Sequence, residues 1–532
     1  TFFGAAHAVT GSCHCLEVNG RKLLIDCGLQ QGQDEHDDNA LDFAPGYIDY
    51  VLVTHAHIDH TGRLPLLAKQ GFNGRILTTR LTGQLMSIML RDSAHIQEGD
   101  AQWKNQKGER AGLPPVEPLY TLDDAEAVLQ QVDTCEYGEM VDLCEGVRVR
   151  FSDAGHLLGS AEIELWCTEN GVTKKLVFSG DLGNVDQPII RDPSYLQEAD
   201  YVIMESTYGD RDHEPPESYT GALAQLIDEV FSKGGNIIIP SFAVGRTQEL
   251  LYFIREIKEK GLVTGHGNFP VYIDSPLATE ATRIFRDTDP DCFDAQTRAL
   301  LEKGIDPINV PGLRISVTSD DSRMINTDRT PKVILSASGM CEAGRIRHHL
   351  KHNLWRPECT ILFVGFQAVG TLGRTLIEGV DSVKLFGEPI EVKAEICQLT
   401  GMSGHADKDG LLRWVNAFTE KPRRVFVIHG EDEVENRFVD TLTEQGFTAC
   451  APYNGAQWAI GAEGAVCLQE GTKVRVEQRT GEGANRAATV FQRLLSAGKR
   501  LLRVIEHNEG GANKDLAKFA DQINALCDKW DR

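Results

Sequence analysis

The stretch "VLVTHAHIDHTG", residues 51–62, places three histidines and an aspartate within six residues, directly after an apolar run. The apolar run predicts a buried strand, and the polar residues then follow it on a loop. Neutral imidazole is a good zinc ligand, and a carboxylate can bind one metal ion or bridge two. On a tight loop, His55 and His57 can face one ion. Asp59 and His60 can then face a neighbouring ion, although a chance cluster on a surface loop is the alternative.

Other apolar strands in the first two hundred residues also run out into loops that begin with a histidine or a carboxylate, at Asp26, His156, Asp181 and Glu205. Loops that follow the strands of layered α/β folds converge at one edge of the sheet. A lone histidine or aspartate is usually structural, but this repetition predicts a shared pocket. Two metal ions roughly 3.5–4 Å apart can share a hydroxide and clamp an in-line displacement at phosphorus.

The pattern of predicted strands, loops and helices changes near residue 210, and the first pattern returns near residue 391. Between these points, four segments each read as a buried strand, a Ser- or Gly-rich turn and a helix, which predicts a mostly parallel sheet. Afterwards the first pattern resumes, with strands that end in polar loops at His405 and His429. We therefore predict a first domain from residues 1–208 and 391–465, an inserted domain from residues 209–390, and a C-terminal extension from residues 466–532.

The turns of the inserted domain predict contacts with phosphate. Free backbone N–H groups at helix N-termini suit phosphate oxygens, and arginines in or just past the turns can join the same anion sites. The candidate phosphate-binding residues are Ser241, Arg246, Ser336, Ser338, Gly339, Arg345 and Arg374. The alternative is that small residues in these turns only allow tight turns and close packing.

The C-terminal extension carries two apolar stripes at helical spacing. They consist of Ala487, Phe491, Leu494, Leu501 and Ile505, and then of Leu516, Phe519, Ile523 and Trp530. The sequence "NEGGAN" between them predicts a helical hairpin. We favour packing on the body of the protein, or self-association as a homodimer, over contact with RNA.

Chain length and amino-acid composition limit the classes of protein to which this chain can belong. A chain of 532 residues is expected to form two or three domains, and 41% hydrophobic with 25% charged residues is ordinary for a soluble globular protein. There is no apolar run of about eighteen residues, so we expect no membrane span. The first residues lack the basic region and apolar core of a signal peptide, and the missing initiator Met leaves room for a few preceding residues.

The thirteen scattered cysteines include no C-x-x-C pair and indicate a reducing, cytoplasmic setting rather than a disulfide framework. A net charge of -24 disfavours a protein that grips nucleic acid over its whole surface. It leaves room for a local basic groove, because the field in a cleft depends on how charge is distributed.

Several motifs resemble a known family. "THAHIDH", "AGHLLGSA" and "FSGDLG" resemble the ordered metal-binding motifs of the metallo-β-lactamase fold, and "LLIDCG" its first strand-end aspartate. "MESTYGD", "SGHAD" and "VIHGE" resemble the three extra motifs of the β-CASP branch, which processes nucleic acids. "PSFAVGRTQEL" and "SASGM" resemble that branch's inserted domain, whereas "GMCEAGR" departs from its more glycine-rich pattern. The resemblance spans residues 1–465 and is closest to the RNA endonucleases of 3′-end processing, in a prokaryotic stand-alone form.

This resemblance implies a metallo-β-lactamase αββα sandwich with an inserted Rossmann-like β-CASP domain, and two Zn²⁺ per chain. It assigns His55, His57 and His156 to the first zinc, Asp59, His60 and His429 to the second, and Asp181 to both as a bridge. Asp26 would hold a ligand imidazole through a hydrogen bond. His405 would stand near the scissile phosphate, with Glu205 orienting it. The bridging hydroxide, oriented by Asp59, would be the nucleophile.

The implied activity is endonucleolytic hydrolysis of single-stranded RNA that leaves a 5′-phosphate and a 3′-hydroxyl. His429 favours RNA, because DNA-directed members of the branch typically lack histidine there. The motif sequences "SGHAD" and "AGHLLGSA" differ from those of the bacterial 5′-exoribonucleases, which remain an alternative. A small-molecule hydrolase for thioesters or lactams would need neither Glu205 nor His405. A non-catalytic RNA-binding protein would lose metal ligands, and this chain keeps all seven.

Overall fold

The computed structural model of the protein describes residues 1–31, 41–110, 112–214, 216–473, 501, 505 and 513–530. These belong to two units, Thr1–Val474 and Arg475–Arg532, each considered by itself.

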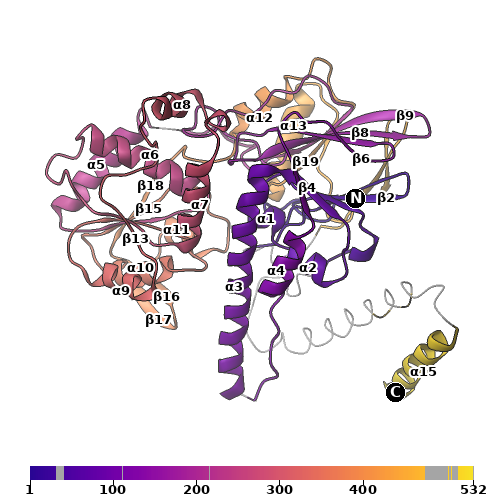
Figure 1. The fold of residues 1–532 in the computed structure, drawn as a ribbon, viewed down its shortest axis with the longest axis horizontal. Coiled ribbons are helices and arrows are strands. Elements are labelled where there is room, and N and C mark those ends of the chain that lie inside the picture. The colour runs from indigo at the N-terminus through magenta and orange to yellow at the C-terminus, as the bar shows by residue number, and fades with distance from the viewer. Residues whose placement is uncertain are drawn as a thin grey trace. The chain divides into compact units, whose positions relative to one another are not determined.

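Two β-sheets build one half of the first unit, on the right in Figure 1. The five-stranded sheet consists, in spatial order, of β1 (His14–Val18), β2 (Arg21–Ile25), β3 (Tyr50–Leu52), β4 (Arg75–Thr79) and β5 (Val132–Cys135). The seven-stranded sheet consists, in spatial order, of β20 (Ala449–Cys450), β19 (Arg424–Ile428), β10 (Tyr201–Glu205), β9 (Val172–Phe178), β8 (Ala161–Glu169), β7 (Val147–Asp153) and β6 (Val141–Cys144).

The two sheets share one buried core, to which each strand contributes alternate residues. In β7, Val147, Val149 and Phe151 are fully buried, while the residues between them are more exposed. These side chains join Leu23 and Leu52 from the other sheet in the same hydrophobic cluster. Because strand side chains alternate between faces, the period of two in "VRVRF" sets which face of the sheet turns inward.

Helices cover the outer face of each sheet. The five-stranded sheet packs against α2 (Leu64–Lys69), α3 (Arg80–Arg110) and α4 (Leu122–Leu129). The seven-stranded sheet packs against α12 (Lys408–Val415) and α13 (Asp432–Glu444), whose Trp414 and Phe438 are fully buried. The result is the four-layer αββα sandwich that the sequence predicted.

A separate, all-parallel sheet of six strands forms the inserted domain. Its spatial order is β13 (Leu313–Ile315), β12 (Val271–Ile273), β14 (Val333–Ser336), β11 (Ile237–Pro240), β15 (Thr360–Phe363) and β18 (Glu395–Gln398). The continuous apolar run in β11 leaves all four residues buried, as expected for a parallel strand covered on both faces.

Helices flank both faces of this sheet. One face packs against α5 (Tyr219–Ser232), α6 (Arg246–Glu259) and α7 (Pro276–Asp287). The other packs against α9 (Ser319–Thr327), α10 (Ile346–Asn353) and α11 (Leu372–Glu378). Smaller elements include α8 (Ala295–Glu302) and the hairpins of β16 (Ser382–Leu385) with β17 (Glu388–Glu391) and β21 (Gln457–Ile460) with β22 (Ala465–Gln469).

Two boundaries differ from those expected. The inserted sheet extends beyond residue 390, because β18 pairs in parallel with β15 rather than with the sandwich. The last domain boundary was placed at residue 465, but β22 crosses it and pairs with β21. Both strands are short, β18 is half exposed and β22 is mostly exposed, so they lack the long apolar run that marks a strand in sequence.

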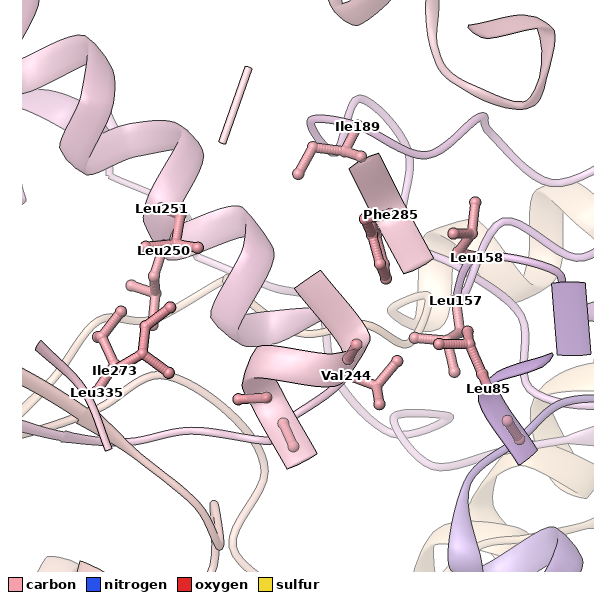
Figure 2. Close-up of a cluster of buried hydrophobic side chains, with 14 of the residues drawn as sticks. Leu85, Leu157, Leu158, Ile189, Val244, Leu250, Leu251, Ile273, Phe285 and Leu335 are labelled. Carbon is pink, nitrogen blue, oxygen red and sulfur yellow. The ribbon is translucent and has the colours of Figure 1, made fainter. Parts of the chain in front are cut away.

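The sandwich and the inserted domain meet in one apolar cluster (Figure 2). Leu157 and Leu158, from the loop after β7, lie beside Leu85 of α3 and close to Phe285 of α7, and all four are nearly fully buried. Val244, just before α6, faces them from the inserted domain. The loop that carries His156 is therefore packed directly against the inserted domain.

In the second unit, the structure describes one helix, α15 (Asn513–Trp530). It confirms a helix across the second apolar stripe, in which Leu516, Phe519 and Ile523 are half buried. Most of the first stripe and the "NEGGAN" turn lie outside the described residues, so the helical hairpin stays a prediction. Within the described parts of the chain, none of the helices combines the length and apolar character needed to cross a membrane.

Candidate metal centre and active site

The loops after four strands bring the seven predicted metal ligands together. His55 and His57 follow β3, and His57 stands just before the short helix α1 (Ile58–Thr61), which carries Asp59 and His60. The other three follow β7, β9 and β19 and are His156, Asp181 and His429. Only the last of them comes from beyond the inserted domain.

The first group consists of His55, His57 and His156. Nδ1 of His57 lies 3.1 Å from Nε2 of His55 and 3.2 Å from Nε2 of His156. Three ring nitrogens therefore point at one spot, which is the arrangement that an N-donor metal site requires.

The second group consists of Asp59, His60 and His429. Nε2 of His60 lies 3.2 Å from Nε2 of His429, and Asp59 Oδ2 lies 3.9 Å and 3.6 Å from these two nitrogens. The side chain of Asp59 is 22% exposed, whereas that of His60 is 2% exposed. Asp59 is thus the member of this group that solvent can reach.

Asp181 joins the two groups through its two carboxylate oxygens. Oδ2 lies 3.4 Å from His55 Nε2 and 3.6 Å from His156 Nε2. Oδ1 lies 3.3 Å from His60 Nε2 and 3.6 Å from His429 Nε2. One oxygen therefore faces each group, as a bridging carboxylate would.

The nitrogens that face away from the centre are held by neighbouring groups. Asp26 Oδ2 lies 2.7 Å from His60 Nδ1, which places this residue where the sequence predicted it. The Thr54 hydroxyl lies 3.1 Å from His55 Nδ1 and donates to Asp26. His156 Nδ1 donates to the carbonyl oxygen of Gly404 at 2.9 Å. Such partners fix the tautomer and the direction of each ring.

Glu205 and His405 stand beside Asp181. The Glu205 Oε1 atom lies 3.0 Å from His405 Nδ1 and also accepts a hydrogen bond from the backbone N–H of Leu182 at 2.7 Å. His405 Nδ1 lies 4.0 Å from Asp181 Oδ2. The structure thus brings the two predicted catalytic residues to the edge of the first group.

Electrostatics divide the histidines into two kinds. Burial lowers the pKa of His55 and His156 well below the ordinary value and that of His57 to about 4, so these rings are neutral. Burial opposes protonation of His60 and His429 as well, but Asp181 together with a second carboxylate, Asp26 beside His60 and Asp59 beside His429, outweighs it and raises their pKa. His60 and His429 therefore favour the protonated, positively charged form, whereas His55, His57 and His156 favour the neutral form.

The carboxylates keep their negative charge despite burial. Burial disfavours the charged form of Asp59, but hydrogen bonding to His429 and the charge of His60 lower its pKa to about 2. Burial is likewise outweighed at His405, where Glu205 and Asp181 raise the pKa to about 9. A carboxylate that stays ionised although it is largely shielded from water favours a bound cation.

Most of the predicted phosphate-binding residues have other partners. Ser241 and Ser336 are 1% exposed, and their hydroxyls contact Thr247 and the backbone oxygen of Asp274. Arg345 donates to the Asp274 carboxylate at 2.7 Å and to backbone oxygens. These three predictions are not supported, because the polar groups that would bind phosphate already hold the turns together.

The remaining candidates differ among themselves. The Ser338 hydroxyl accepts a hydrogen bond from Glu342 N, and Arg374 pairs with Glu378 on the same helix. A side chain at Gly339 would meet the ring of Phe242 at 2.9 Å, so glycine allows close packing there.

Arg246 is the candidate that lies at the centre. It is buried and paired with Glu249. A side chain built at Gly404 would lie 3.1 Å from His156 Cε1 and 3.6 Å from Arg246 Nη2. The guanidinium therefore approaches the same backbone segment that holds His156 and precedes His405.

Sequence reasoning missed the supporting residues Thr54 and Thr207. Thr54 binds His55 and Asp26, and the Thr207 hydroxyl lies 3.1 Å from His429 Nδ1. Thr54 directly precedes His55, and Thr207 lies two residues after Glu205. Both of these neighbours were predicted site residues. Hydroxyl residues adjoining ligand motifs were the available signal, because they can reach the outer nitrogen of a ligand imidazole.

Three family models match successive parts of the chain. They are described as the metallo-β-lactamase superfamily for residues 8–241, the β-CASP domain for residues 247–376, and the Zn-dependent metallo-hydrolase RNA specificity domain for residues 389–452.

Curated relatives agree with these matches. The chain is 37% identical to Ribonuclease TTHA0252 of Thermus thermophilus, over 81% of this chain and 93% of the relative. It is 30% identical to transcription termination factor FttA of Methanocaldococcus jannaschii, over 83% of this chain and 68% of that protein.

Proposed function

We propose that this chain, which belongs to the β-CASP branch of the metallo-β-lactamase superfamily and is a metal-dependent hydrolase, cleaves single-stranded RNA. The proposed cleavage is endonucleolytic and uses two zinc ions. The observation that carries the proposal is the position of Asp181, which turns one oxygen to each of two ligand groups while His405 stands at the edge of the first.

The residues present fit two zinc ions. Imidazole nitrogens and carboxylate oxygens are zinc's usual ligands, and two groups of them meet at a shared carboxylate. Asp181 Oδ1 is buried and forms no hydrogen bond with any residue that the structure describes. An ionised oxygen in that condition is costly unless a cation satisfies it.

We assign the first zinc to His55, His57 and His156, the second to Asp59, His60 and His429, and the bridge to Asp181. When bound, the metal ions supply Lewis-acid polarisation of the phosphate and make a water molecule more acidic. Asp59 is placed to orient that water, because it is the ligand with an exposed carboxylate.

His405 is placed to protonate the leaving 3′-oxygen. Its Nδ1 faces Glu205, which leaves Nε2 as the nitrogen that hands over the proton. Glu205 is itself fixed by the backbone N–H groups of Leu182 and Thr207, so the imidazole is held in one orientation. Arg246 is placed to bind the phosphate beside this ring.

RNA is the proposed substrate for two reasons. The family model that covers His405 and His429 is described as an RNA specificity domain, and the relative whose length the chain covers to 93% is named a ribonuclease. We place the enzyme in the cytoplasm, because all thirteen cysteines are free thiols, which suits a reducing compartment.

The test is incubation of the purified protein with 5′-labelled single-stranded RNA and, separately, DNA, with and without a chelator. Internal cuts in RNA that vanish with chelator and in His57→Ala are expected, and His95→Ala, at an exposed position on α3, is the matched control. Release of mononucleotides from the 5′ end would replace the endonuclease proposal with an exonuclease. Intact RNA and DNA in the presence of bound metal would refute the nuclease proposal.

A further inference from the structure

Three aromatic side chains surround the candidate active site and take no part in the proposed chemistry. Tyr208 follows β10, Phe242 follows β11 and Phe366 follows β15. All three are half buried, so each leaves part of its ring accessible. We refer to Tyr208, Phe242 and Phe366 as the aromatic rim.

The rim lies against the imidazole rings of the centre. The ring centroids of Phe242 and His57 are 6.2 Å apart, and those of Tyr208 and His405 are 6.3 Å apart. Two rim residues therefore adjoin the two ends of the site, one beside a proposed zinc ligand and the other beside the proposed proton donor.

The rim residues also hold one another. Tyr208 meets Phe366 edge to face, with centroids 6.0 Å apart. A side chain at Gly365 would lie 3.8 Å from the Phe242 ring, and Gly365 directly precedes Phe366. Gly339 also comes so close to the Phe242 ring that an added carbon would lie 2.9 Å away. Glycines at these positions let the ring stand where it does.

Ordinary core packing does not explain Phe242. Its neighbours in sequence, Ser241, Ala243 and Val244, are 1%, 7% and 2% exposed, whereas Phe242 remains partly open to solvent. Phe242 therefore offers part of an apolar ring next to the imidazole of His57. The face of a nucleobase suits such a ring, and Arg246, four residues further along, is placed for the adjoining phosphate.

We propose that the aromatic rim is a nucleobase-binding subsite, in which Phe242 stacks on a base next to the cleaved bond and Tyr208 with Phe366 receives a base on the other side. This inference rests on the proposed function. Stacking is available only to bases that are not paired, and every base offers a face. The rim therefore selects single strands and tolerates any sequence at the cut.

The test uses short oligouridylates that carry one 2-aminopurine, whose fluorescence is quenched by stacking, at successive positions. All proteins carry His405→Ala, so that cleavage does not interfere and binding alone is read. We expect quenching at one or two adjacent positions. Phe242→Ala and Phe242→Leu should abolish it at the position that stacks on Phe242 and weaken binding about tenfold to hundredfold, as loss of one stacked base does. Phe242→Tyr should retain it.

The comparison between variants separates stacking from packing. Leucine keeps the apolar volume and supports Gly339 and Gly365, but it has no aromatic face. Phe386→Ala is the matched control, because Phe386 is an exposed ring between β16 and β17 that stacks on His348. Equal quenching in Phe242→Leu and in the parent would overturn the subsite.

The readout does not depend on cleavage, so the two proposals can fail separately. Quenching that requires Phe242, in a protein that cuts no RNA when His405 is present, would support the subsite and refute the nuclease. Cleavage of RNA without any Phe242-dependent quenching would do the reverse.

Discussion

The Glu205 carboxylate lies 3.0 Å from Nδ1 of His405, across a sequence separation of 200 residues. Glu205 is the last residue of β10 and His405 lies on the loop before α12, and the inserted domain lies between them in sequence. Variants of Glu205 and His405 therefore test whether side chains from the two parts of the sandwich act together in one site.

Replacing His405 by alanine should lower kcat by about 10²–10⁴-fold, the usual contribution of a positioned proton donor. Glu205→Gln should lower kcat less, because the amide keeps the shape but not the charge that orients the imidazole. Metal content should be unchanged in both. The control is Glu280→Gln on α7, whose side chain is 52% exposed. If His405→Ala has the same kcat as the wild-type protein, His405 takes no part in the mechanism.

Metal content should follow the division into two groups. Each chain is expected to hold two zinc ions, and His57→Ala and His429→Ala should each lose about one, because the rings belong to different groups. Asp181→Asn should weaken both, since each oxygen faces one group. Elemental analysis after dialysis measures the stoichiometry. A full complement in Asp181→Asn would contradict the bridge.

Asp26→Asn should weaken zinc binding at the second group by about 10–100-fold, the range found when the partner of a ligand histidine is removed. The reason is that Asp26 Oδ2 holds His60 Nδ1 at 2.7 Å. Competition with a chromophoric chelator measures the affinity. Asp133→Asn, at a half-exposed surface pair with Arg75, serves as the control and should bind zinc normally.

Phe285→Ala should lower the free energy of unfolding by about 3–5 kcal/mol, because the ring is 3% exposed and its loss leaves a cavity in a packed cluster. The change should appear as a lower midpoint in a denaturant titration. Hydrogen exchange should also rise around Leu157 and Leu158, which lie close to Phe285 (Figure 2). Leu262→Ala, at a 39% exposed position, should change stability by no more than about 0.5 kcal/mol.

Asp153 should make stability depend on pH between about 4 and about 6. Burial raises the pKa of its carboxyl from 3.8 to about 6, against the opposing charge of Arg191. The folded state then binds the proton more tightly than the unfolded state, so this contribution is largest below pH 4 and is lost as pH rises to 6. Asp153→Asn should flatten the curve in that window. An identical pH dependence in mutant and wild type would contradict the assignment.

The sequence predicted which side chains come together at the centre better than it predicted the phosphate contacts, for a physical reason. H-x-H-x-D-H after a buried strand restricts both residue type and backbone position, and the structure brings those side chains together with His156, Asp181 and His429. A Ser- or Gly-rich turn is less specific. Ser336 is such a residue, and its hydroxyl binds the backbone oxygen of Asp274, a partner 62 residues away.

Elements at the ends of domains were also hard to predict. β18 is a strand because β15 pairs with it, and its own residues, half of them exposed, do not distinguish it from the neighbouring loops. The aromatic rim was not recognised because Tyr208, Phe242 and Phe366 lie on three separate loops. In sequence they are isolated rings, and only the fold brings them close to the same histidines and to one another.

The order of the ligands along the chain also bears on when the enzyme becomes active. His60 and His429 face each other at 3.2 Å although they are 369 residues apart. While the protein is being synthesised, domains fold from the N-terminus onward, and the first group of ligands leaves the ribosome long before His429 does. A nascent chain therefore lacks both the second group and His405 until most of the polypeptide has been made. The candidate active site of such an enzyme is completed only late in the synthesis of the chain.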